Sequence, residues 1–120
     1  MNDQELVELL LSNYSEQYRL YQALLQNLHA GLPRTGEAPD LPRILKVLQE
    51  RNRTFDTIKA LDERIQRNKI GWDRRKNELH SVSAETLKTL LRNIADILGK
   101  VMETNTRLEE ALSQRTGKSG

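Results

Sequence analysis

Cysteine is absent from this chain of 120 residues, and aromatic residues are few. Without cysteine there is no disulfide, no thiolate metal site and no cysteine nucleophile, which fits a reducing compartment. The aromatic residues are one Trp, one Phe and three Tyr. Any core must therefore be built mainly from aliphatic side chains.

Long apolar runs and a strong charge of one sign are also missing. No apolar stretch approaches the roughly 20 residues that span a bilayer. Asp3, Glu5 and Glu8 interrupt the region where a signal peptide would lie. The net charge is only +2, whereas wholesale nucleic-acid binding favours a larger basic excess. We expect a soluble, cytoplasmic protein with no membrane insertion and no nucleic-acid partner.

Residue patterns for catalysis or metal binding are sparse. The only histidines, His29 and His80, fall at opposite ends of the expected second helix, too far apart to share a metal. Gly117-Lys118-Ser119 resembles the end of a phosphate-binding loop, but the required earlier glycine is replaced by leucine at 112. We predict no enzyme activity, no cofactor and no metal site.

The strongest pattern that is present covers residues 84–112. Written as heptads, its a, d and e positions are apolar or alanine with two exceptions, Thr104 and Asn105. A helical period sustained over four heptads predicts a helix that buries one stripe. The a positions are Leu87, Ile94, Val101 and Leu108.

Two further helices are predicted, at about residues 3–30 and 41–80. All three prolines lie in the intervening loop, 31–42. The second helix repeats one apolar heptad position, with Arg51 as the exception, and Gly71 is the weak point where it would kink or break. Residues 113–120 are predicted to be a flexible tail.

These elements predict a single all-α domain over residues 1–120. We expect an antiparallel three-helix bundle with a long central helix and coiled-coil-like packing. Because the helices differ in length, each end would hold a two-helix section with an under-covered apolar stripe. We predict a second partner surface, suited to dimerisation, in one such section: Ile65, Trp72 and Leu79.

A second apolar ridge flanks the core seam of the last helix. It consists of Leu91, Ala95, Leu98 and Met102. One interpretation is that a helix touching two neighbours needs a wide apolar face. The other is that the ridge receives the amphipathic helix of a client protein. The residues predicted to bind a client are Leu91, Ala95, Leu98, Met102, Asn105, Leu108 and Leu112.

Two other features each have two interpretations. The basic run between Arg64 and Lys76 is either a solvated face with local ion pairs or a docking surface for an acidic protein or nucleic acid. Tyr14, Tyr18 and Tyr21 share one helical face, either as core or as a contact for a partner.

The pattern resembles the FlgN-type flagellar export chaperones. The resemblance is carried by Asn105-Thr106-Arg107-Leu108, by the preceding ladder Leu90-Leu91-Ile94-Ile97-Leu98, and more weakly by Leu61-Asp62-Glu63-Arg64. It implies a cytoplasmic type III export chaperone. Such a protein binds the amphipathic terminal segments of hook-associated subunits, keeps them unpolymerised and delivers them to the export apparatus. The alternative hypothesis is a structural coiled-coil module that forms a homodimer through its central helix.

Overall fold

The computed structural model describes residues 1–117, with side chains up to residue 114, and this part of the chain is all helical and turn structure. The helices are α1 (Asp3–Gly31), α2 (Leu41–Arg64), α3 (Gln66–Arg75) and α4 (Val82–Gly117). None of them is both long and apolar enough to cross a membrane. The predicted all-α bundle is confirmed.

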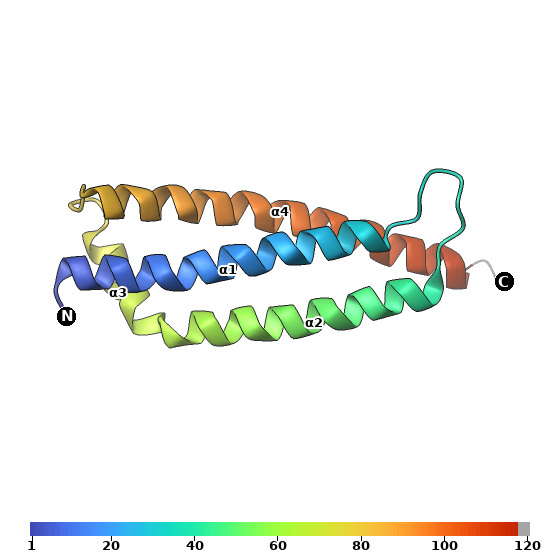
Figure 1. Ribbon diagram of the computed structural model, residues 1–120, viewed down its shortest axis with the longest axis horizontal. Coiled ribbons are helices and arrows are strands. Elements are labelled where there is room, and N and C mark those ends of the chain that lie inside the picture. Colours follow the sequence, from blue (N-terminus) through green and yellow to red (C-terminus); the bar gives the residue numbers. More distant parts are fainter. Residues whose placement is uncertain (118–120) are drawn as a thin grey trace.

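The three long helices run up, down and up along an elongated molecule of 60 × 23 × 20 Å. Figure 1 shows α1 and α4 running in the same direction, with α2 opposed to both. The α1–α4 contact is the most extensive, and α2 packs mainly on α1 rather than on α4. The short helix α3 lies at the end of the bundle where α1 begins. α1 is therefore the helix that holds the other three together.

Each long helix begins at a residue suited to capping it. The Asn2 side chain accepts a hydrogen bond from the Glu5 amide at 2.8 Å. Asp40 does the same for the Arg43 amide at 3.3 Å, and the Ser81 hydroxyl accepts from the Ala84 amide at 3.1 Å. Such side chains satisfy backbone N–H groups that have no partner within the first turn.

The prediction of one long central helix is wrong, because the helix breaks at Ile65. There φ is −112° and ψ is 13°, and the amide bonds back only three residues, to the Asp62 carbonyl at 3.2 Å. The Asp62 carboxylate stabilises this corner. Gln66 Nε2 donates a hydrogen bond to it at 2.9 Å, and Lys69 Nζ lies 3.1 Å from it. Gly71, where a break was predicted, lies inside α3.

The break turns α3 back under the start of α1. A straight helix would continue along the α2 axis. Instead Trp72 packs in a cluster with side chains from α1 and α4. The predicted two-helix section at this end is therefore replaced by three helices. The predicted flexible tail is also wrong up to Gly117, which still belongs to α4; residues 118–120 lie outside the described residues.

The core consists of two apolar clusters along the bundle axis. The α3-end cluster contains Leu6, Val7, Leu10, Tyr14, Ile65, Trp72, Ala84 and Leu87. The loop-end cluster contains Tyr21, Leu24, Leu28, Ile44, Val47, Ile58, Ile97, Val101, Leu108 and Ala111. The buried residue Gln17 lies between the two clusters in the sequence of α1, and it donates a hydrogen bond to Asn13 Oδ1 at 2.8 Å. Asn13 Nδ2 in turn donates to the Leu61 carbonyl of α2, also at 2.8 Å. This polar connection fixes α1 against α2, because a buried amide must keep its partners.

Candidate functional site

The predicted client-binding ridge on α4 is divided between core and surface. Leu108 is fully buried in the loop-end cluster, so its assignment to a client surface is wrong. Met102, by contrast, is 61% exposed, and Ala95 is exposed as well. The remaining leucines are half-buried and pack against the two core clusters: Leu91, Leu98 and Leu112. The ridge thus leaves only two well-exposed apolar side chains.

Asn105 is occupied by a contact within the bundle. Arg51 Nη1 donates to Asn105 Oδ1 and lies 3.3 Å from the Glu109 carboxylate. The Arg51 side chain is only 17% exposed, so its charge is largely removed from water and needs these partners. Arg51, the exception in the apolar repeat of α2, thereby bridges α2 to α4. Asn105 belongs to this bridge.

The predicted second partner surface is wrong. Ile65 is 1% exposed and Trp72 is 4% exposed, while Leu79 is half-buried against the same α3-end cluster. The physical reason is that side chains of α1 and α4 pack around Ile65 and Trp72. The stripe is therefore satisfied within one chain.

A different surface, the groove between α1 and α4, is open and partly apolar. Its first part has a volume of about 590 Å³ and lies near the turn that precedes α4. Its second part, of about 410 Å³, continues toward the loop end. Asn93 lines both parts, so they adjoin at this residue. From Val82 to Lys100 the groove follows α4 for about 27 Å at the helical rise per residue.

The apolar wall of this groove on α1 comes from one heptad position. Leu11, Tyr18 and Leu25 are seven residues apart, half-buried, and all line the groove. Leu90 and Ile97 face them from α4. None of the residues predicted to bind a client lines this groove. The sequence signal for the groove is a third apolar heptad position on α1, occupied by Leu11, Tyr18 and Leu25.

The tyrosine face divides between the core and this groove. Tyr14 and Tyr21 are buried, whereas Tyr18 lines the groove. Burial, with a smaller effect of the Asp62 and Asp73 carboxylates, raises the pKa of Tyr14 to about 12. Burial also raises the pKa of Tyr21 above its ordinary value. Both core phenols thus remain neutral at physiological pH, and only Tyr18 is placed to touch a partner.

Charged side chains surround the first end of the groove. Glu85 accepts from Lys88 Nζ at 3.1 Å and lies 3.2 Å from His80 Nδ1. These hydrogen bonds, first that of Lys88, hold the pKa of Glu85 below its usual value. Lys88 Nζ also donates to the Leu79 carbonyl at 2.8 Å, which ties the turn to α4. This end is ordered by local contacts and presents both signs of charge.

Among the described residues, no three His, Asp or Glu side chains gather as metal ligands. Comparison of this chain with protein-family models, with curated proteins and with solved structures finds no match. The described surface offers a partly apolar groove that follows α4 for about 27 Å.

Proposed function

We propose that this chain is a helix-binding chaperone that holds an amphipathic segment of a client protein in the groove between α1 and α4. The observation that carries the proposal is the groove lined by Leu11, Tyr18, Leu25 and Leu90. Half-buried leucines that face water are unfavourable in free energy, and an apolar helix face that covered them would remove this penalty.

The occupant is a helix because of the shape and the packing rules. α1 and α4 run side by side, and a third helix laid in their outer groove would make, with α2, a four-helix arrangement. Recognition of this kind uses apolar residues at helical spacing on the incoming segment. The groove length corresponds to about five turns of such a helix.

The resemblance to FlgN-type chaperones supplies the class of client. Under the proposal, the clients are terminal segments of flagellar hook-associated proteins, bound in the cytoplasm before export and kept from polymerising. The groove differs from the ridge predicted from the sequence, although both lie on α4. Ile65 and Trp72 are buried within one chain, so they offer no surface for the predicted dimerisation.

Two matched substitutions on α4 discriminate the groove from the ridge. Asn93 lines the groove and Ala95 lies on the ridge; both are exposed and both sit in the same helix. Asn93→Arg places a long side chain in the groove, and Ala95→Arg places the same side chain on the ridge. The probe is a labelled terminal peptide of a hook-associated protein, titrated by fluorescence anisotropy. We expect Asn93→Arg to weaken binding by about tenfold or more, and Ala95→Arg to leave binding unchanged.

The amide chemical shifts of the unmodified protein give an independent location. The expected shifts on adding the peptide cluster at Leu11, Tyr18, Leu25 and Leu90. A control peptide of the same composition, with its amphipathic order scrambled, should not produce them. If Ala95→Arg alone abolishes binding, the ridge is the site. If both variants bind as the unmodified protein does, or no hook-associated peptide binds, the proposed function is wrong.

A further inference from the structure

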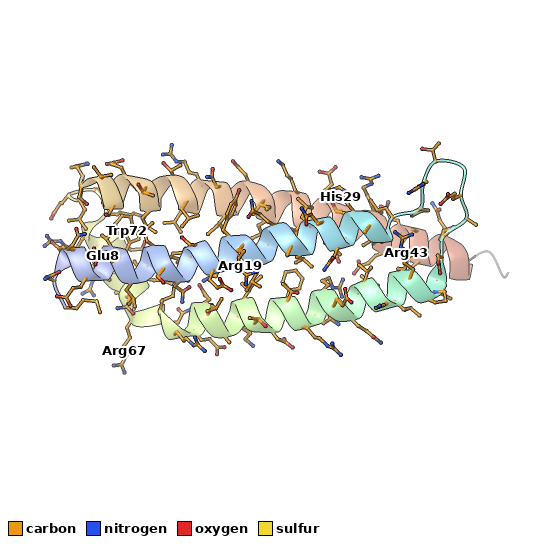
Figure 2. All side chains as sticks on the ribbon, in the orientation of Figure 1. Glu8, Arg19, His29, Arg43, Arg67 and Trp72 are labelled. Atoms are coloured by element: carbon orange, nitrogen blue, oxygen red, sulfur yellow. The ribbon has the colours of Figure 1, made fainter. Side chains whose placement is uncertain are left out.

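The short helix α3 and the residues around it concentrate positive charge. Residues 64–76 contain six Lys or Arg and one acidic residue, so this segment carries a net charge of +5 in a chain whose total is +2. The remainder of the protein is therefore net negative. The break at Ile65 places this charge at one end of the bundle, at the corner where Arg67 projects away from the other helices (Figure 2).

Half of these cations are neutralised within the chain. Lys69 pairs with Asp62 at 3.1 Å, Arg75 with Asp3 at 2.7 Å, and Lys76 with Asp73 at 3.4 Å. The other three are exposed arginines, and no carboxylate of the described residues lies within salt-bridge distance of them: Arg64, Arg67 and Arg74. A solvated face with local ion pairs explains the three paired cations, but it does not explain the three unpaired arginines.

The unpaired arginines flank an exposed apolar residue. Arg67, Ile70 and Arg74 follow one another at three and four residues, so they share one face of α3. Ile70 is 56% exposed, although its neighbour Trp72 is 4% exposed. Arg64 lies one residue before the break, on the rim of a shallow hollow lined also by Leu9 and Leu61. The α3 face thus combines two guanidinium groups with an apolar centre, and a third guanidinium, that of Arg64, lies at the adjoining end of α2.

This combination selects among anionic partners. An exposed aromatic side chain for base stacking, which single-stranded nucleic acid uses, is missing from this face because Trp72 is buried. A phosphate backbone also offers no apolar group to cover Ile70. An acidic peptide segment with an apolar residue between its carboxylates matches both features, since guanidinium groups bind carboxylates with matched geometry.

We propose that the α3 face formed by Arg67, Ile70 and Arg74, together with Arg64 at the adjoining end of α2, is a second docking surface, which binds an acidic amphipathic segment of another protein. This surface is separate from the α1–α4 groove, and the proposal does not depend on what occupies that groove. A protein with both surfaces would hold one partner along its side and another at its end.

The probe is a fluorescein-labelled, alanine-based helical peptide with Glu at positions i and i+7 and Leu at i+3 on one face. A matched peptide carries Gln in place of Glu. The triple variant Arg64→Gln, Arg67→Gln, Arg74→Gln removes the unpaired cations. The control triple variant Arg53→Gln, Lys59→Gln, Arg92→Gln removes the same charge from exposed positions elsewhere. Circular dichroism and thermal melting check that both variants fold.

We expect the acidic peptide to shift amides of residues 64–76 and to bind more weakly as salt is raised. The α3 variant should lose about tenfold in affinity, and the control variant should bind as the unmodified protein does. Equal losses in the two variants would mean non-specific attraction and would overturn the proposal. So would tighter binding of a single-stranded oligonucleotide of equal charge to this face. Sedimentation that shows a dimer lost only in the α3 variant would make a second copy the occupant and overturn it too.

Discussion

At the scale of single residues, the polar exceptions in the heptad pattern tie the helices together. Arg51 interrupts the apolar repeat of α2 and Asn105 that of α4, and the two meet across the bundle with Glu109 alongside. Gln17 interrupts α1 and is satisfied by Asn13. Buried polar groups of this kind specify register, because any other alignment leaves them without partners.

The Arg51–Asn105 contact gives a prediction on stability. Arg51→Ala leaves Asn105 Oδ1 without its donor, and we expect a loss of about 1–2 kcal/mol in the free energy of unfolding. Asn105→Ala should cost a similar amount, and the double variant should cost clearly less than the sum of the two. Urea unfolding of the four proteins gives the coupling energy. Simple additivity would show that the two side chains do not depend on each other.

At the scale of elements, a glycine allows the end of α1 to pack closely against its neighbours. Gly31 is the last residue of α1, and a Cβ there would lie 3.1 Å from Val47 Cγ2 and 3.3 Å from Leu108 Cδ2. This close approach lets α1 end against both α2 and α4. Gly99 in α4 differs, because a Cβ there would meet no atom within 4 Å.

The two glycines should respond oppositely to alanine. Gly31→Ala crowds the loop-end cluster, and we expect a loss of about 1 kcal/mol in the free energy of unfolding. Gly99→Ala should add up to about 1 kcal/mol, because alanine favours the helix and nothing obstructs it. Urea midpoints at constant m-value measure both changes. If both substitutions stabilise the protein, the side chains that surround Gly31 must make room for a methyl group without a loss in the free energy of unfolding.

α3 shows what local sequence reasoning misses at the element scale. Its residues continue the apolar repeat of α2 through Ile65 and Trp72, so the repeat predicts one straight helix. Glycine is the usual weak point of a helix, yet the break occurs six residues earlier, at an isoleucine. The repeat could not show the tertiary outcome, in which Ile65 and Trp72 pack with side chains of α1 and α4 in the α3-end cluster.

At the scale of the whole molecule, docking of α3 completes the core at one end. Trp72 is the sole tryptophan, and it packs with residues of α1 and α4. Trp72→Ala should therefore lower the free energy of unfolding by about 3 kcal/mol or more, as for other buried aromatic residues. Ile70→Ala, in the same helix but exposed, is the control and should change it by about 0.5 kcal/mol or less. Far-UV circular dichroism in urea follows both; similar effects would mean that α3 is not part of the cooperative fold.

The placement of the candidate site also belongs to this scale. The heptads of the sequence place Leu11, Tyr18 and Leu25 at one apolar position of α1. They did not show which apolar position a neighbouring helix would cover. α2 lies against one side of the α1–α4 pair, which half-buries Leu91 and Leu98 and leaves the opposite side open.

The sequence by itself determined the helical class and the apolar stripes, because these depend on residues three to seven positions apart. The tertiary structure alone decided the break at Ile65, the burial of the predicted dimer surface and the side of α4 that faces water. Those outcomes depend on which helix fills which space, and α1, α2 and α4 all carry more apolar positions than one neighbour can cover. A pattern along one helix records that surplus, and only the packing of the others shows where it remains exposed.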